Sequence, residues 1–128
     1  MKDLKNLLPG NKNDVEQAKK LKDLDRSQVL LLLPDLIGYT KDINWPVAPI
    51  VVETLLRFPT EIIPSVQAVL AEDDDNWKWF LLNYLVSKLP LDSKFHFKGY
   101  LIRVAETPTE SEMAEELDYL SKSILETM

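Results

Sequence analysis

The sequence predicts an all-α fold in which about three antiparallel helix pairs stack behind an N-terminal lid helix. Apolar residues recur at helical spacing along the chain, and no segment alternates with the period of two that marks a strand. The string DINW at Asp42–Trp45 also returns as DDNW at Asp74–Trp77, 32 residues later, and an apolar run follows each copy. This period is typical of helical hairpins that stack because one pair alone cannot bury its apolar face.

Length and composition predict one globular domain over residues 1–128, with 45% hydrophobic and 28% charged residues. Cysteine is absent, which excludes a disulfide framework and thiolate metal sites. The first residues lack the apolar core of a secretory signal, and the longest apolar run, Val29–Leu33, is too short for a membrane span. We therefore expect a cytoplasmic protein with no membrane contact.

The net charge of −6 is unevenly distributed along the chain. Residues 1–31 carry seven Lys/Arg and five Asp/Glu, whereas residues 32–128 carry eight and sixteen. An acidic chain repels the phosphate backbone, so no nucleic-acid partner is expected. The acidity serves solubility or, in the sharper interpretation, fits a basic partner.

The N-terminal part is predicted as a lead-in over residues 1–12 and a helix over residues 13–26, which acts as a lid. Asn13 or Asp14 caps this helix. Its outer face is basic and carries Lys19, Lys20 and Lys22.

The first helix pair is predicted over residues 27–58. Ser27 caps its first helix. Pro34 then either splits this helix or leaves one bent helix that reaches about Thr40, because proline removes a backbone hydrogen bond. The second helix starts at an Asn44 cap with Pro46 in its first turn, and it is apolar nearly all round, so we expect it to be buried.

The second pair is predicted over residues 60–90. Its first helix, Thr60–Glu72, is amphipathic, with Pro64 interrupting its start, and is therefore expected at the periphery. Its second helix starts at an Asn76 cap and is apolar nearly all round, so it is the second buried helix.

The third pair is predicted over residues 92–127 and lacks a tryptophan. Asp92 or Ser93 caps its first helix. Thr109 and Glu112 form the T-x-x-E pattern of a capping box, which starts a single final helix that ends near Glu126.

The chain resembles HEAT-type and armadillo-type repeats, in which an acidic residue occupies the turn between paired helices, as Asp42 and Asp75 do here. It resembles more closely a family of small bacterial proteins described as domain of unknown function 5071. The residues that carry this resemblance are LLPGNKND at 7–14, LLPDLIGYTKDINWPVA at 32–48, DDDNWKWFLLNYLVSKLP at 73–90 and AETPTESE at 105–112. The resemblance implies a compact α-helical repeat fold and implies no activity.

No catalytic, cofactor or metal site is predicted. His96 is the only histidine, and a single histidine without cysteine has a surface or packing role. The acidic run Glu72–Asp75 lacks the alternating ligands and the glycine of a calcium loop, so a capping role is expected. No phosphate-binding glycine motif occurs. We therefore expect a protein that is not an enzyme and needs no cofactor.

The tryptophans are the best functional candidates. Trp45 and Trp77 follow the predicted caps and are expected to pack on the turns, with Trp77 in the core. Trp79 lies two positions later, so it points to another side of the helix and nearer the surface. The second helices of such repeats commonly form the binding face. The predicted protein-binding residues are Arg57, Lys78, Trp79, Asn83 and Lys88.

The leading hypothesis is a protein- or peptide-binding repeat module of the adaptor or immunity type. The alternatives are a minimal DNA-acting enzyme of the HEAT-repeat type and a structural homo-oligomer, and the sequence leaves the oligomeric state open. The charge of the binding face discriminates between the first two hypotheses. A basic groove favours DNA, whereas an apolar or acidic groove favours protein.

Overall fold

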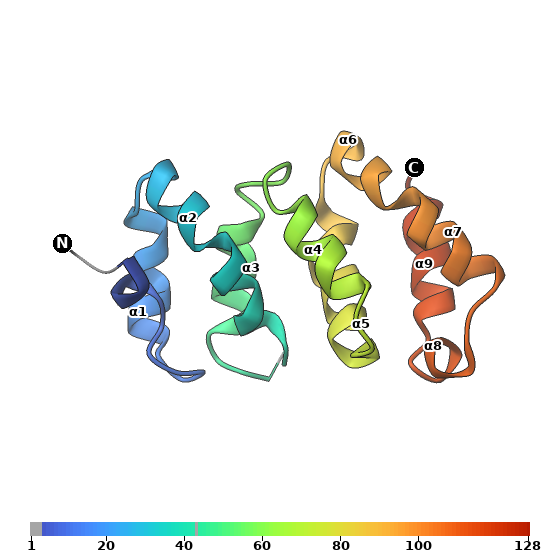
Figure 1. Cartoon of the computed structure of the whole chain (residues 1–128), viewed down its shortest axis with the longest axis horizontal. Helices are drawn as coiled ribbons and strands as arrows, with labels where there is room; N and C mark the ends of the chain where they lie inside the picture. Colours follow the sequence, from blue (N-terminus) through green and yellow to red (C-terminus); the bar gives the residue numbers. More distant parts are fainter. Residues whose placement is uncertain (1–3, 43) are drawn as a thin grey trace. The chain divides into compact units, whose positions relative to one another are not determined.

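The computed structural model describes residues 4–42 and 44–128, and every regular element among them is a helix (Figure 1). The all-α prediction is therefore confirmed for this part of the chain. Residues 1–3 of the predicted lead-in, and Ile43, lie outside the described residues. None of the described helices is both long enough and apolar enough to cross a bilayer.

Short helices are interspersed among longer ones in the described part of the chain. The α-helices are α1 (Val15–Lys19), α2 (Arg26–Leu36), α3 (Ala48–Leu55), α4 (Ile63–Leu70), α5 (Asp75–Tyr84), α6 (Leu91–Lys94), α7 (Lys98–Glu106), α8 (Glu110–Ala114) and α9 (Leu117–Leu125). The 3-10 helices are η1 (Leu4–Leu7), η2 (Lys20–Asp23), η3 (Ile37–Thr40), η4 (Val86–Lys88) and η5 (Phe95–Phe97). The chain divides into two compact units, Met1–Ser65 and Val66–Met128, and their boundary falls within α4.

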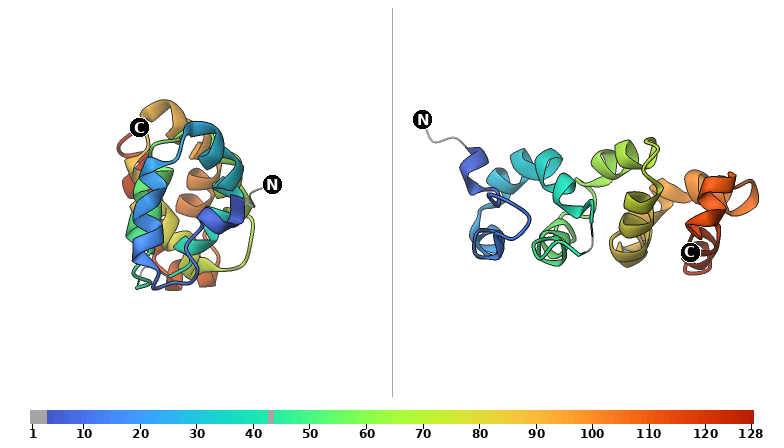
Figure 2. Two further views of the ribbon diagram at one scale, coloured as in Figure 1. Left: turned by 90° about the vertical axis from the view of Figure 1, so that its left-hand side faces the viewer. Right: turned by 90° about the horizontal axis from the view of Figure 1, so that it is seen from below.

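In the first unit, α3 packs against α1, η2, α2 and η3, as the blue to green part of Figure 1 shows. Figure 2 views α1 and α2 from the N-terminal end. The fully buried side chains of this unit include Leu21, Val29, Leu36, Val51 and Leu55. The apolar α3 is thus the central helix of its unit, as its composition predicts.

In the first unit, aspartate side chains cap the helices α1 and α2. Asp14 accepts a hydrogen bond from the backbone N–H of Gln17 at 3.2 Å and starts α1. The prediction that Ser27 caps the next helix is wrong: Asp25 accepts from the N–H of Gln28 at 2.9 Å, and Gln28 completes the capping box. An aspartate two residues earlier reaches the first exposed N–H groups, so the helix starts before Ser27.

Two prolines of the first helix pair had predicted roles, and only the role of Pro46 is wrong. Pro34 lies inside α2 without splitting it, and η3 continues the path to Thr40, close to the single-helix alternative. Pro46 precedes α3, whose first turn holds Pro49 instead. Asn44 is not the cap, because the N–H of Ala48 donates to the carbonyl of Trp45 in a turn that delays the helix.

In the second unit, α9 packs against α5, α7 and α8. The cap of α5 is Asp74, which accepts from the N–H of Trp77 at 3.1 Å, so the predicted Asn76 cap is wrong by two residues. The acidic turn therefore has a capping role, through a residue earlier than expected. The helix α4 starts at Ile63, which places Pro64 in the first turn, where it interrupts nothing.

The third predicted pair contains more breaks than its periodicity indicates. The Thr109–Glu112 capping box is present, but the helix it starts ends at Ala114, and Glu116 adopts a left-handed conformation with φ of 59° before α9 begins. The helix expected from Asp92 or Ser93 is divided into α6, η5 and α7, with Pro90 as the first cap. The helices α7 and α9 keep apolar side chains in the core, whereas Leu91 of α6 and Met113 of α8 are exposed.

Candidate functional site

The predicted binding residues do not all lie on an exposed face. Arg57 is exposed just beyond the end of α3, in the first unit. The others belong to the second unit, where Trp79 and Asn83 are half-buried on α5 and Lys88 is exposed in η4. Lys78 is buried, with 7% of its surface exposed.

Lys78 is therefore corrected from a surface contact to an internal ion pair. Its Nζ lies 3.1 Å from Oδ1 of Asp75, one turn earlier on α5, and the two side chains are only 9% and 10% exposed. Removing one partner of a buried ion pair costs stability, and an amine buried in this way presents little surface to a ligand. This pairing depends on how deeply the first turn of α5 is covered, which the sequence does not show.

The tryptophans of α5 divide as the helical geometry predicts. Trp77 is 6% exposed and belongs to the core, whereas Trp79 is half-buried. The Trp79 ring lies edge-on to Tyr84, with 6.0 Å between ring centres. Trp45 is half-buried in the turn before α3, where its backbone N–H donates to the backbone carbonyl of Asp42. Trp79 is thus packed on its own helix, and only part of its ring is accessible.

A groove of about 250 Å³ lies in the first unit between α1–η2 and α3. We call it the basic groove, and its lining residues are Ala18, Lys19, Lys22, Ile50, Glu53, Thr54 and Arg57. Ala18 and Thr54 are buried and form its floor together with half-buried Ile50. The four charged residues are exposed and form its rim.

The rim carries three cations and one carboxylate. In residues 4–42 and 44–128, no Asp or Glu forms an ion pair with Lys19, Lys22 or Arg57. Glu53 lies one turn before Arg57 on the same side of the helix, but the two side chains are not paired. The groove therefore has an excess of positive charge in a chain whose net charge is −6.

Arg57 is held by an aromatic neighbour. Its guanidinium lies 5.6 Å from the centre of the Phe58 ring, and Arg26 approaches the same ring at 5.5 Å. Arg26 also binds Glu61, at 2.5 Å, and its hydrogen bond lowers the pKa of that carboxyl. Arg57 has no such carboxylate among the described residues, so its hydrogen-bond donors remain available to a ligand.

Sequence reasoning missed Lys19 and Lys22 as site residues. Both belong to the basic outer face of the predicted lid helix, and the positive balance of residues 1–31 was a signal for them. Their position opposite Arg57 arises only from the packing of α1 and η2 against α3. The expected basic outer face is thus also one wall of a groove.

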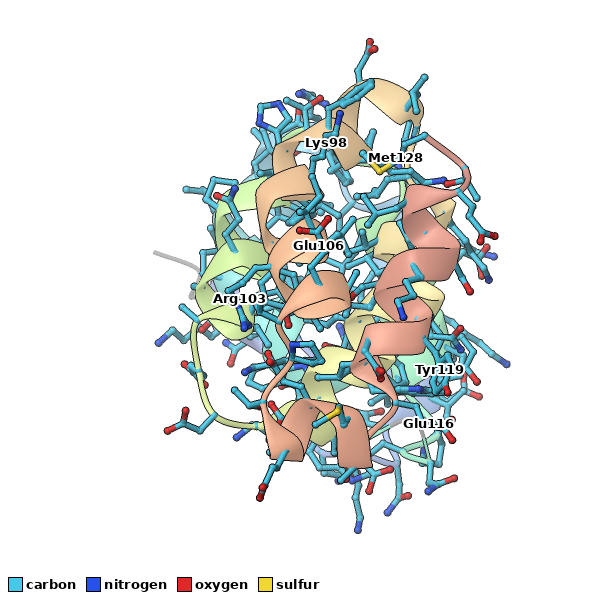
Figure 3. The ribbon with its side chains drawn as sticks, turned by 90° about the vertical axis from the view of Figure 1, so that its right-hand side faces the viewer. Lys98, Arg103, Glu106, Glu116, Tyr119 and Met128 are labelled. Carbon is cyan, nitrogen blue, oxygen red and sulfur yellow. The ribbon has the colours of Figure 1, made fainter. Side chains whose placement is uncertain are left out.

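A second charged cluster lies in the second unit and joins α5, α7 and α8. Arg103 donates two hydrogen bonds to Glu112, at 3.1 and 2.5 Å, and Ser111 donates to Asp75, the partner of Lys78. Glu112 also accepts from the N–H of Thr109 at 2.8 Å. Figure 3 labels Arg103 on α7. Because its charged members are paired with one another, we assign this cluster to holding the helices together.

Tyr100 borders this cluster. Burial, followed by the charge of Glu112, raises the pKa of its hydroxyl to about 12. Across the described ranges, no three His, Asp or Glu side chains are placed to hold a metal ion. His96 is exposed, and its carbonyl accepts a long hydrogen bond of 3.4 Å from Gln67.

The described part of the chain is thus all-helical and has a small groove rimmed by cations that pair with no carboxylate of the described residues. The chain belongs to the family described as domain of unknown function (DUF5071), whose model matches residues 7–125. The match spans nearly the whole chain and confirms the family resemblance seen in the sequence. No curated protein matches the chain.

Proposed function

We propose that this protein is a protein- or peptide-binding module and that the basic groove is its docking site. The observation that carries the proposal is the convergence of Lys19, Lys22 and Arg57 around an apolar floor with no ion-pair partner among the described residues. Cations without partners are costly to hold close together, and a ligand with negative charge relieves their repulsion.

The size of the groove supports a docked peptide segment over an enclosed small molecule. At about 250 Å³, the groove is smaller than the usual range of roughly 300–1,000 Å³ for ligand pockets. A peptide places only a few side chains into such a groove and lays the rest along the rim. Arginine is among the residues that most often carry binding energy, and Arg57 is exposed and oriented by Phe58.

The repeated string in the sequence supports the same proposal. Trp45 lies in the turn before α3 and Trp77 in the first turn of α5, at equivalent places in the two copies of the Asx-Trp string. We propose that the helix pairs form a HEAT- or armadillo-like stack, in which the helices α3 and α5 correspond. Stacks of this type commonly act as scaffolds, which fits an adaptor or immunity-type protein.

Nucleic-acid binding is the second candidate, because a basic groove favours an anionic backbone. Two observations weigh against it: the chain has a net charge of −6, and Glu53 stands among the cations of the rim. A duplex binder that makes about 6–10 phosphate contacts needs more cations than the three of this groove.

The test is affinity capture from the native cell combined with a charge-reversal pair. Arg57→Glu is expected to lose a captured protein, because the reversed charge repels an anionic ligand. The matched control is Lys20→Glu, which changes the net charge equally from an exposed residue of η2 that does not line the groove.

A photo-crosslinking residue at Ile50 then shows whether the captured protein occupies the groove. The proposal predicts a crosslink in the Lys20→Glu background and none in the Arg57→Glu background. Equal capture by both variants, with no crosslink at Ile50, would remove the groove as the docking site.

A further inference from the structure

We infer that the occupant of the basic groove is an acidic peptide segment, in which carboxylates flank a small or apolar residue. The inference rests on the proposed binding function and names the chemistry of its partner. It also differs from the alternative of a basic partner, which the overall charge of the chain left open.

The two walls of the groove place cations on both sides of an apolar floor. Lys19 and Lys22 are three residues apart on the α1–η2 wall, so their side chains project from neighbouring turns toward one side. Arg57 stands on the opposite wall, just beyond the end of α3. A segment that lies between the walls meets a cation on each side, and its central side chain meets Ala18 and Ile50.

The chemistry of the cations fits carboxylates. The planar guanidinium of Arg57 matches a carboxylate with two parallel hydrogen bonds, and its stacking on Phe58 reduces the freedom lost on binding. The two lysines donate from flexible stems, so they accept carboxylates at more than one spacing. Arg57 therefore fixes the orientation of one carboxylate, whereas the two lysines accept a second carboxylate at several positions.

The carboxylate of Glu53 favours a peptide over a nucleic acid as the occupant of the groove. Its exposed carboxylate stands in the same lining as the three cations. A duplex carries one negative charge for about every 1.7 Å of its axis, so it cannot avoid Glu53. A peptide has spaced charges, and it can place a lysine, an amide or a backbone N–H opposite Glu53.

The experiment uses two short synthetic peptides that differ in charge only. One alternates Glu with Leu, and in the other Gln replaces every Glu. Binding to the isotope-labelled full chain is followed by amide chemical shifts at increasing salt concentration. The parallel probes are a short DNA duplex and inorganic phosphate.

We expect the Glu peptide to shift amides of α1, η2 and α3 and to bind about tenfold more weakly, or worse, to Arg57→Glu than to Lys20→Glu. Its affinity falls as salt screens the charges, and Glu53→Gln strengthens it because a repulsive carboxylate is removed. The Gln peptide is expected to leave the groove amides unshifted.

Three results would overturn the inference. Equal binding of both peptides would mean that the groove recognises apolar side chains, and the proposed binding function would survive. Tighter binding of the duplex than of the Glu peptide would assign the groove to nucleic acid. Groove shifts with phosphate alone would make it a site for small anions. The proposed function fails separately, through equal capture by the two charge-reversal variants.

Discussion

Burial separates residues that look equivalent in the sequence. Trp77 and Trp79 share a helix and lie two positions apart, but Trp77 is 6% exposed and Trp79 keeps part of its ring at the surface. Arg26 and Arg57 approach the same ring of Phe58, but only Arg26 binds a carboxylate of the described chain. Environment, and not residue type, therefore separates a core tryptophan from a half-buried one, and an arginine with a carboxylate partner from one without.

Replacing Trp77 with alanine is expected to lower the free energy of unfolding by about 3–5 kcal/mol, because it leaves a large cavity in the core of the second unit. The matched variant Trp79→Ala removes the same atoms from a half-buried position and is expected to cost clearly less. Chemical denaturation followed by circular dichroism measures both values. Equal losses would contradict the difference in burial.

The short helix α8 depends on contacts at its ends. It has five residues, too few for a helix that is stable by itself, and its first turn is held by the capping box of Thr109 and Glu112. Arg103 on α7 adds two hydrogen bonds to the same carboxylate. Glu112 therefore links the helix cap to the neighbouring helix.

The Glu112 contacts predict a pH dependence of stability. The hydrogen bond from Arg103, helped by that from Thr109, lowers the pKa of Glu112 below its ordinary value of 4.5 in the folded chain. A lowered folded-state pKa gives a contribution that is present above the ordinary value and is lost as pH falls through the lowered one. We expect Glu112→Gln to cost about 1–2 kcal/mol at neutral pH and to flatten the loss of stability on acidification.

Denaturant unfolding of both proteins between neutral pH and pH values below the ordinary carboxylate pKa checks this prediction. The stabilities of wild type and Glu112→Gln should converge as the pH falls. Asp25 and Glu61 also have lowered pKa values, through hydrogen bonds from Gln28 and Arg26 respectively, so both proteins still lose some stability in acid. A constant gap at all pH values would exclude the carboxylate of Glu112 as the cause.

The break between α8 and α9 stores local strain. Glu116 has φ of 59°, in the left-handed region where side chains other than glycine cost roughly 1–2 kcal/mol. Glu116→Gly is expected to stabilise the chain by up to about 1 kcal/mol, after the larger backbone entropy of unfolded glycine is subtracted. Glu115→Gly is the control, because Glu115 has φ of −90° and offers no strain to relieve. A thermal scan that ranks the two variants in the opposite order would contradict the prediction.

At the scale of the whole molecule, the chain has two compact units, Met1–Ser65 and Val66–Met128. The helix α4 contains the boundary between them, so both units contribute residues to one continuous helix. The single domain expected over residues 1–128 remains a prediction. It means that the two units unfold in one cooperative transition. A single helix forms and melts cooperatively, so a boundary inside α4 favours one transition.

We therefore predict one unfolding transition, observed separately in each unit by tryptophan fluorescence. Trp45 reports on the first unit when Trp77 and Trp79 are replaced by phenylalanine, and Trp77 reports on the second when Trp45 and Trp79 are replaced. Coincident midpoints within each variant, between fluorescence and circular dichroism, support one cooperative domain. A midpoint of the Trp45 signal that differs from that of the whole helical signal would contradict it.

The sequence by itself determined the features that depend on neighbours along the chain. Helical periodicity predicted an all-α fold, since the repeat of apolar residues follows from helix geometry alone. The Thr109–Glu112 box was predictable because both partners lie within one turn. Caps were misplaced where a nearby aspartate, Asp25 or Asp74, competed successfully with the expected residue, because several side chains within two positions can reach the same N–H groups.

Only the tertiary structure decided which residues line the candidate site. Sequence reasoning selected Arg57 by residue type and position, and the structure leaves it exposed; Lys78 was selected in the same way and is buried against Asp75. The facing cations Lys19 and Lys22 are more than thirty residues from Arg57 in the chain, and they meet it because α1 and η2 pack on α3. Distance in space between such residues depends on packing, which no local pattern in the sequence encodes.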